Sequence, residues 1–147
     1  MAKNIEVLRI PANGDPEFIT ITNDLSGMQK VVNGYIEFVG FPFKKSKYAL
    51  TINEEGRLID LPLNVRATYL VNKAYKTLNN PMAATVIVGD GFVALHGIQS
   101  RSVKESDKFD LLAEVNETDV ERWYLKEGGK EVIEQALNKP LYSITSF

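Results

Sequence analysis

The sequence predicts an α+β domain with a mainly antiparallel sheet of short strands, packed helices and a C-terminal helical pair. Three observations lead to this fold class. Short apolar segments alternate with glycine-containing turns, a pattern typical of β-hairpins. A segment that begins at Asn64 carries apolar residues at helical spacing. A second such region, residues 118–137, is interrupted by two adjacent glycines, which predicts two consecutive helices.

The composition is that of one globular domain. The chain has 147 residues, of which 44% are hydrophobic and 24% charged, as in ordinary folded proteins. Without cysteine, disulfides, thiolate zinc sites and cysteine nucleophiles are excluded. A single histidine excludes a multi-histidine metal site, and the net charge of −2 argues against nucleic-acid binding. With no apolar run of membrane-spanning length, the expected location is the cytoplasm.

The N-terminal third predicts a hairpin and a capped helix. Strands are expected at Ile5–Ile10 and Glu17–Ile21, joined by a proline- and glycine-containing turn. Asn23 or Asp24 is a suitable N-cap for the helix that follows. Asn33-Gly34 should end that helix, with the glycine in the left-handed conformation.

The next segment predicts a central strand and a second hairpin. Residues 35–39 are apolar enough to suggest a strand covered on both faces. A strand at Tyr48–Ile52 should turn at Asn53-Glu54-Glu55-Gly56 into another at Arg57–Leu61, with Gly56 supplying a positive φ. Pro62 ends that strand.

The longest helix of the first two thirds is expected to start near Val65 and to run towards Leu78, with Asn64 as its N-cap. Its buried face should contain six apolar residues: Leu63, Ala67, Leu70, Val71, Ala74 and Leu78. An adjoining face carries Arg66, Tyr69, Lys73 and Lys76.

The last third predicts one more hairpin and then helices. Ala84–Val88 and Phe92–Leu95 flank a Gly-Asp-Gly turn, and Phe109–Val115 resembles a weaker strand or an extended lead-in. Thr118 and Glu121 have the spacing of a capping box, which predicts a helix through Trp123 and Tyr124 towards Gly128-Gly129. A second helix is expected at Lys130–Leu137; the alternative is one helix that bends at the two glycines.

Three motifs give the chain a family resemblance. These are GYIEFV at residues 34–39, NEEGRLIDLPLN at 53–64 and VIVGDGFVAL at 86–95. In order and spacing they resemble an uncharacterised domain family of phages, plasmids and bacterial accessory genomes. The resemblance covers Ile5 to Leu95, so residues 1–97 are expected to form a family-like core and residues 98–147 a C-terminal helical extension of one domain. The motif positions are Tyr35, Glu37, Asn53, Glu54, Gly56, Pro62, Asn64 and Arg66.

A candidate anion site lies at the start of the central helix. The amides of a helix N-terminus and its partial positive charge favour anions, and the Arg66 guanidinium could hold a phosphate or carboxylate. The alternative is structural: Asn64 caps the helix and Arg66 pairs with a nearby glutamate such as Glu54. The candidate ligand-binding residues are Tyr35, Glu37, Asn53, Glu54, Asn64, Arg66 and Lys73.

The segment Phe41–Tyr48, FPFKKSKY, combines three lysines with three aromatic rings. That combination suits a nucleotide-contacting loop. The alternative, which is favoured, is a solvated loop whose phenylalanines pack into the core and whose lysines keep it soluble.

The leading functional hypothesis is a non-catalytic phage-type protein that counters a host defence. It would sequester a small anionic nucleotide-like ligand or mask a host defence protein, and it needs no cofactor or metal. The second hypothesis is a phosphate-substrate hydrolase that uses carboxylates, with His96 or Glu54 as base. The third is a structural, oligomeric module. A homo-oligomer is expected because Trp123 and Tyr124 would be effective interface anchors.

Overall fold

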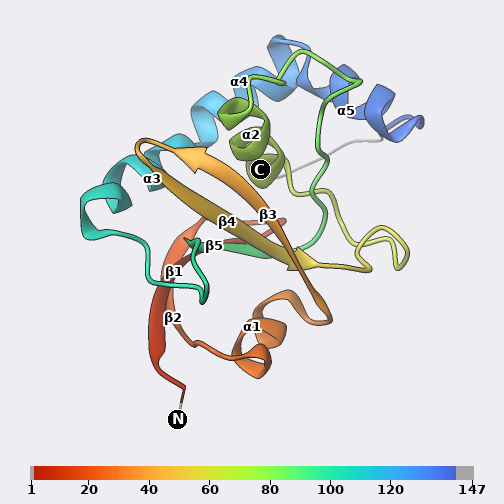
Figure 1. The fold of residues 1–147 in the computed structure, drawn as a ribbon. Coiled ribbons are helices and arrows are strands. Elements are labelled where there is room, and N and C mark those ends of the chain that lie inside the picture. Colours follow the sequence, from red (N-terminus) through yellow and green to blue (C-terminus); the bar gives the residue numbers. More distant parts are fainter. Residues whose placement is uncertain (1, 142–147) are drawn as a thin grey trace.

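An antiparallel β-sheet of five strands, in the order β2-β1-β5-β4-β3, lies at the centre of the computed structural model, which describes residues 2–141 (Figure 1). The strands are β1 Asn4–Ile10, β2 Glu17–Thr22, β3 Ile36–Phe43, β4 Ser46–Asn53 and β5 Gly91–Leu95. Every neighbouring pair in the sheet is antiparallel. The fold is therefore α+β, as predicted.

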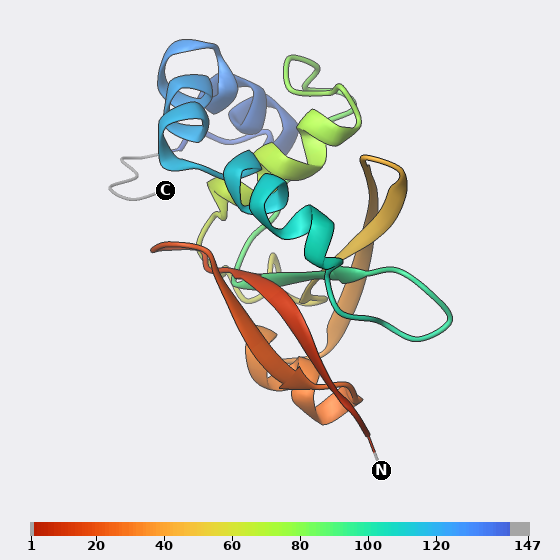
Figure 2. The ribbon, with the colours of Figure 1, turned by 90° about the vertical axis from the view of Figure 1, so that its left-hand side faces the viewer.

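The helices cover the two faces of the sheet unequally. They are α1 Leu25–Val32, α2 Val65–Ala74, α3 Lys108–Glu114, α4 Glu117–Lys126 and α5 Gly129–Leu137, with a short 3-10 helix at Glu105–Asp107. Figures 1 and 2 show α1 alone on one face and the other helices on the opposite face. The expected C-terminal helical pair is present as α4 and α5. Among residues 2–141, no helix is both long and apolar enough to cross a membrane.

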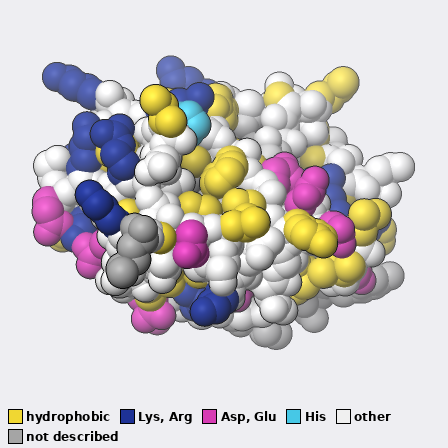
Figure 3. All heavy atoms as spheres, turned by 60° about the horizontal axis from the view of Figure 1, so that its bottom comes forward, with side chains coloured by type: hydrophobic (Ala, Val, Ile, Leu, Met, Phe, Trp, Pro, Cys, Tyr) yellow, Lys and Arg dark blue, Asp and Glu magenta, His cyan; other side chains and the backbone are white. Residues whose placement is uncertain are grey.

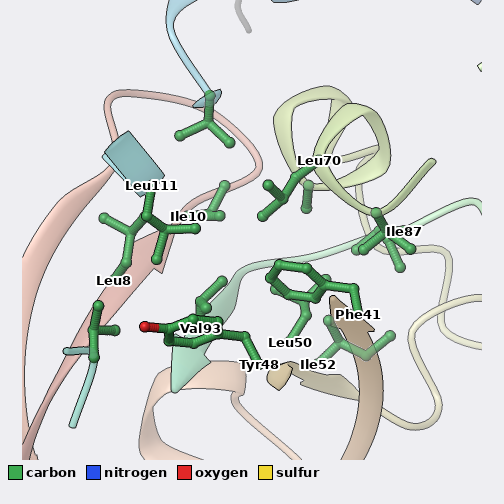
Figure 4. Packing of buried hydrophobic residues seen from close by; sticks show 14 of the residues in the cluster. Leu8, Ile10, Phe41, Tyr48, Leu50, Ile52, Leu70, Ile87, Val93 and Leu111 are labelled. Atoms are coloured by element: carbon green, nitrogen blue, oxygen red, sulfur yellow. The ribbon is translucent and has the colours of Figure 1, made fainter. Parts of the chain in front are cut away.

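The larger core lies between the sheet and helices α2 and α3. Alternate residues of the inner strands point into it, because successive side chains of a strand face opposite sides. Figure 4 shows these side chains meeting beneath α2. The fully buried members include Leu8, Ile10, Phe41, Tyr48, Leu50, Leu70, Ile87, Val93 and Leu111.

A smaller core lies beneath α1 on the other face. Met28 and Val32 of that helix pack against Ile5, Val7, Ile21, Phe92 and Ala94 of β1, β2 and β5. Asp24 caps the helix by accepting a hydrogen bond from the Gly27 amide at 2.7 Å. Asn33 ends it with a φ of 59°, so the left-handed residue is the asparagine and not the predicted Gly34. Because α1 has only eight residues, it leaves the part of this face next to β3 uncovered.

Among residues 2–141, α2 is the most enclosed helix. Residues 65–72 are all buried, including Arg66 and Asn72. The sheet covers one side of α2, and a third apolar cluster with α4 and α5 covers another. That cluster contains Val65, Tyr69, Val86, Val120, Trp123, Tyr124 and Ile133.

Several predicted elements differ in the structure, beginning with two expected strands. Arg57–Leu61 forms turns instead of a strand, and Gly56 does not have a positive φ. An added Cβ at Gly56 would lie 2.8 Å from Val88, so close packing explains the glycine. Residues 84–87 are not a hairpin arm, and Val88 forms a single bridge to Leu63. The Gly89-Asp90 segment instead makes tertiary contacts: the Gly89 amide donates to the Pro62 carbonyl, and Asp90 accepts from the Ala12 amide.

The other corrections concern an edge strand and two helices. Residues 36–39 belong to β3, which is an edge strand and not a central one, and Tyr35 directly precedes it. Residues 109–115 belong to α3 and its C-cap instead of a strand, because Leu111 and Val115 are buried one helical turn apart. Asn116 caps α4 by accepting from the Asp119 amide, two residues before the predicted Thr118 cap.

Candidate functional site

Asn64 serves the fold and not a ligand. Its side-chain oxygen caps α2 by accepting from the Ala67 amide at 3.0 Å. Its side-chain nitrogen donates to the carbonyls of Ile10 and Gly89, each at 2.9 Å. The residue is fully buried, as are the first residues of α2. The helix start is therefore closed to an external anion, and the cap is the part of the prediction that the structure confirms.

Arg66 is also used inside the molecule. Its guanidinium donates to the Val115 carbonyl at 2.7 Å and forms an ion pair with Asp15 at 3.2 Å. The expected Glu54 partner is not involved. Because the arginine side chain is only 5% exposed, it holds α3 and the β1–β2 turn against α2 and offers little surface to a ligand.

Lys73 lies at the last turn of α2 and joins that helix to α3. Its ammonium is 2.7 Å from the Glu114 carboxylate and 5.6 Å from the centre of the Tyr69 ring. The hydrogen bond to Glu114 raises the pKa of Lys73. Lys73 therefore connects two helices and does not contribute to the site at the end of β4.

Asn53 and Glu54 lie where β4 ends. The buried Asn53 side chain donates to the carbonyls of Val32 and Asn33 and accepts from the Glu55 amide. The Glu54 amide donates to the Tyr35 carbonyl at 2.8 Å, which continues the β3–β4 pairing by one residue. The motif segments 34–39 and 53–64 are therefore joined here by a backbone hydrogen bond.

A polar hollow of about 560 Å³ lies beside these residues. Its wall includes Tyr35, whose ring is exposed, together with Asn53 and Lys30. The rest of the lining comes from Ser26 and Gln29 of α1, from Asn33 and Gly34 at its end, and from Glu55 and Ile59. Of the seven candidate ligand-binding residues, only Tyr35 and Asn53 line this hollow, with Glu54 next to Asn53 in the chain.

Glu37 is exposed on β3 and pairs across the sheet with Ile52. Its side chain alternates with those of Ile36 and Phe38, so it lies on the face that carries α2. The polar hollow is next to α1 on the other face. The structure therefore places Glu37 and Asn53 on opposite faces of the sheet.

The basic segment is a β-hairpin and not a long loop. Strand β3 continues through Phe43, Lys44 has a φ of 53°, and β4 starts at Ser46. Lys44 forms ion pairs with Asp107 and Asp110. The buried Tyr48 hydroxyl donates to Asp107 at 2.5 Å. Burial, with that hydrogen bond second, raises the pKa of Tyr48.

The two bases of the hydrolase hypothesis are far apart. The His96 amide donates to the Lys47 carbonyl near the start of β4, whereas Glu54 follows the end of that strand. Seven residues of extended chain separate these points by about 20 Å. Within residues 2–141, no cluster of three or more histidine or acidic side chains could hold a metal ion.

An apolar groove of about 380 Å³ occupies the uncovered part of the α1 face. Leu25 of α1 is 59% exposed, Phe38 of β3 is 51% exposed, and Ile98 in the loop after β5 is fully exposed. Other residues that line it are Met28, Ile36, Ala49 and His96. Figure 3 shows apolar side chains gathered beside the histidine on this face. Several exposed apolar side chains in one groove are typical of an interaction site.

The outer edge of β3 borders this groove. Only β4 pairs with β3 in the described sheet. The Glu54 amide donates to the Tyr35 carbonyl, and this hydrogen bond fixes which backbone groups of β3 point towards β4 and which point outward. In that register, Ile36, Phe38 and Gly40 direct their N–H and C=O groups outward. The Tyr75 hydroxyl donates to the Gly40 carbonyl at 2.7 Å, which confirms this direction. Figure 2 shows the strand at one side of the molecule.

Trp123 and Tyr124 pack inside the chain. Each is 2% exposed, and the Trp123 ring lies 5.6 Å from that of Tyr69. Burial raises the pKa of Tyr124 to about 12. A protein contact through these two rings would need α4 to move away from α2, so in this structure they are core residues and not interface residues.

Sequence reasoning missed the groove because its residues are scattered. Leu25, Phe38 and Ile98 lie on a helix, a strand and a loop, so no sequence motif connects them. The only local signal was the apolar density of residues 35–39, which exceeds what an edge strand needs. An edge strand with many apolar residues indicates an exposed apolar face. The order of strands in the sheet, which shows that β3 is at the edge, could not be read from the sequence.

Comparison with known proteins gives a family. The model of DUF3846, a domain of unknown function, matches residues 5–112. This range contains the entire sheet, α1, α2 and the start of α3, and it continues past the predicted end at Leu95. No curated protein and no solved structure matches the chain. Because the family model covers most of its length, the chain belongs to the DUF3846 family.

Proposed function

We propose that this protein is a non-catalytic binding protein that masks a partner protein with the groove beside β3. The observation that carries the proposal is the cluster of exposed apolar side chains at Leu25, Phe38 and Ile98. Burying such side chains contributes about 25 cal/mol for each Å² removed from water. Exposing these side chains to water is therefore unfavourable in the isolated chain, and burying them against a partner would stabilise a complex.

The setting that we propose is a mobile genetic element, in which the partner is a host defence protein. This setting rests on the motif resemblance at residues 34–39, 53–64 and 86–95. A masking protein needs a complementary surface and no catalytic group. The use of Asn64 and Arg66 inside the fold agrees with that requirement, since it removes the anion site predicted at the start of α2.

Site-specific photocrosslinking in the host cell tests this proposal. A photoreactive phenylalanine analogue at position 98 should give one discrete adduct, and the same analogue at position 82 should not. Met82 is an appropriate control because it is as exposed as Ile98 but belongs to the segment that follows α2, a helix on the face of the sheet opposite α1. Phe38→Asp should abolish the adduct while the melting temperature stays unchanged. Equal labelling from both positions, or no adduct at position 98, would refute the proposal.

A second candidate function is sequestration of a small nucleotide-like anion in the polar hollow. The observation that favours it is that Tyr35 and Lys30 line the same hollow. The tyrosine ring could stack on a base, and the lysine could pair with a phosphate. Among the described residues, Lys30 forms no ion pair. Calorimetric titration with linear and cyclic nucleotides should show binding that Lys30→Ala and Tyr35→Ala each weaken. Absence of heat with every nucleotide would exclude this function.

The hydrolase hypothesis has its own test. In an assay of phosphate-substrate hydrolysis, His96→Ala should behave like the parent chain, because His96 and Glu54 lie at opposite ends of β4. Hydrolysis is the readout, since His96 also lines the groove proposed for masking. A large loss of activity with an unchanged melting temperature would make a catalytic function the better proposal.

A further inference from the structure

We infer that the groove and the free edge of β3 together bind an extended acidic-apolar peptide segment, which adds to the sheet as a sixth strand. The inference rests on the proposed masking function and specifies how the partner is held. Strand addition uses backbone hydrogen bonds for affinity and alternate side chains for specificity. The edge of β3 supplies both.

The backbone groups set the length of the added segment. Ile36 and Phe38 each direct an N–H and a C=O outward, and Gly40 adds its N–H. The Gly40 carbonyl already accepts from the Tyr75 hydroxyl, although a carbonyl has a second lone pair. Pro42 has no N–H, so the ladder ends there. The edge therefore accommodates about five residues of an added strand, opposite Ile36 to Gly40.

The side chains of β3 set the apolar positions of the peptide. Residues of the added strand that lie opposite Ile36 and Phe38 would point to the same face as those two residues. That face contains the groove lined by Leu25, Ala49 and Ile98. Apolar residues at these two positions of the peptide would therefore cover the exposed Phe38 ring and enter the groove.

A lysine of the protein determines where the bound peptide should carry an acidic residue. Gly40 has no side chain, and Lys47 from β4 lies over it: a Cβ at Gly40 would be 3.6 Å from the Lys47 Nζ. Within the described residues, this ammonium has no carboxylate partner. A glutamate opposite Gly40 would lie beside it. In an antiparallel strand this glutamate comes two residues before the first apolar residue.

The charge at Lys47 also decides between a peptide and a second copy of the chain. A symmetric pairing of two β3 strands centred on Phe38 would place Ile36 of the second copy opposite Gly40. The lysine would then face an apolar residue and stay unpaired. An acidic segment from another protein satisfies both the charge and the groove.

Fluorescence anisotropy with a labelled, terminally blocked peptide, Thr-Glu-Thr-Val-Thr-Val-Thr, tests the inference on the full chain. We expect saturable binding, weakened about tenfold by Phe38→Pro, which removes one outward N–H and obstructs the added strand. Phe38→Thr keeps the backbone and should weaken binding less. Replacing the glutamate of the peptide by glutamine should cost about threefold, and that difference should disappear in the Lys47→Ala chain.

The control peptide Thr-Glu-Val-Thr-Val-Thr-Thr places glutamate and valine on opposite faces and should bind more weakly. Equal affinity for both peptides, or equal affinity of the Phe38→Pro and Phe38→Thr chains, would overturn strand addition. A mass on light scattering that falls from dimer to monomer with Phe38→Pro would show that the edge takes a second copy instead. If the adduct from position 98 survives Phe38→Pro but not Phe38→Asp, masking stands and only strand addition fails.

Discussion

A single buried asparagine joins three parts of the chain. Asn64 caps α2 and also donates to the carbonyls of Ile10 and Gly89, which are 54 and 25 residues away. We expect Asn64→Ala to lower the free energy of unfolding by about 3 kcal/mol, because the cap is lost and two buried carbonyls lose their donor. Asn64→Asp keeps the cap but replaces the donor with an acceptor, so it should be no better than alanine. Urea denaturation measures both.

Asp24→Ala is the matched control, since Asp24 caps the shorter α1 at an exposed position. It should cost about 1 kcal/mol. A similar small cost for both alanine variants would mean that the carbonyl contacts of Asn64 contribute nothing.

Two buried tyrosines make stability sensitive to alkaline pH. Burial raises the pKa of Tyr124 to about 12 and also raises that of Tyr48, whereas an unfolded tyrosine titrates near about 10. Above pH ~10 the unfolded chain releases these protons and the folded chain keeps them, so stability falls as pH rises through the folded pKa. Urea denaturation of the Tyr124→Phe chain between about pH 9 and 12 should show a shallower decline than that of the parent. Parallel declines would contradict this assignment.

The roles of single residues could be predicted from sequence only where their partners are close in the chain. The Asn64 cap was correct because the Ala67 amide is three residues away. The Arg66 partner was wrong because Asp15 and the Val115 carbonyl come close only in the folded chain. The same reason explains why three of the predicted ligand-binding residues, Asn64, Arg66 and Lys73, hold elements together.

At the scale of elements, the edge position of β3 has a direct test with proline. Phe38 directs its N–H outward, whereas Val39 pairs with Leu50 and directs its N–H into the ladder. We expect Phe38→Pro to fold with a small loss of stability, because proline is tolerated where an edge strand faces solvent. Val39→Pro removes a ladder hydrogen bond and should cost about 3 kcal/mol. Thermal melts followed by circular dichroism compare the two.

If both proline variants melt alike, the register of the β3–β4 hairpin differs from the one described. The comparison is matched, since the two positions are adjacent and both carry apolar side chains. Because the comparison measures stability only, it tests the edge position of β3 without a binding partner.

Element types were predictable where apolar spacing and turn residues agree, as in the β1–β2 hairpin, α1 and α2. They were not predictable where tertiary contacts replace local pairing. Gly89-Asp90-Gly91 resembles a hairpin turn, but Asp90 forms an ion pair with Arg9 and also accepts from the Ala12 amide. The α3 segment resembled a strand because its apolar residues are close together, although Leu111 and Val115 already have helical spacing.

At the scale of the molecule, the segment that follows β5 is attached to the sheet. The sequence predicts a core of residues 1–97 and an extension after it, and the family match covers residues 5–112. Two contacts join residues beyond 97 to the sheet: Tyr48 donates to the buried Asp107, and the Val103 amide donates to the Glu6 carbonyl. The segment after β5 is thereby fastened to both halves of the sheet before α3 begins.

The helical pair α4–α5 covers α2 within the same chain, so its removal should expose a core and not merely shorten the protein. Val120, Trp123 and Tyr124 pack on Val65 and Tyr69, and burying three such side chains contributes about 6 kcal/mol. That equals the lower end of the total stability of an ordinary domain, about 5–15 kcal/mol. A chain that ends at Val115, which keeps the carbonyl that Arg66 needs, should therefore be largely unfolded or aggregated, as measured by circular dichroism and light scattering.

The intact chain answers the separate question of oligomeric state. A dimer stays a prediction from sequence, but with Trp123 and Tyr124 at 2% exposure its contact must use another surface. Trp123→Phe keeps an apolar ring in the cluster, so it should change the mass on light scattering in neither direction and lower the melting temperature slightly. A dimer that this variant converts to a monomer would return Trp123 to the interface and would mean that α4 leaves α2 in solution.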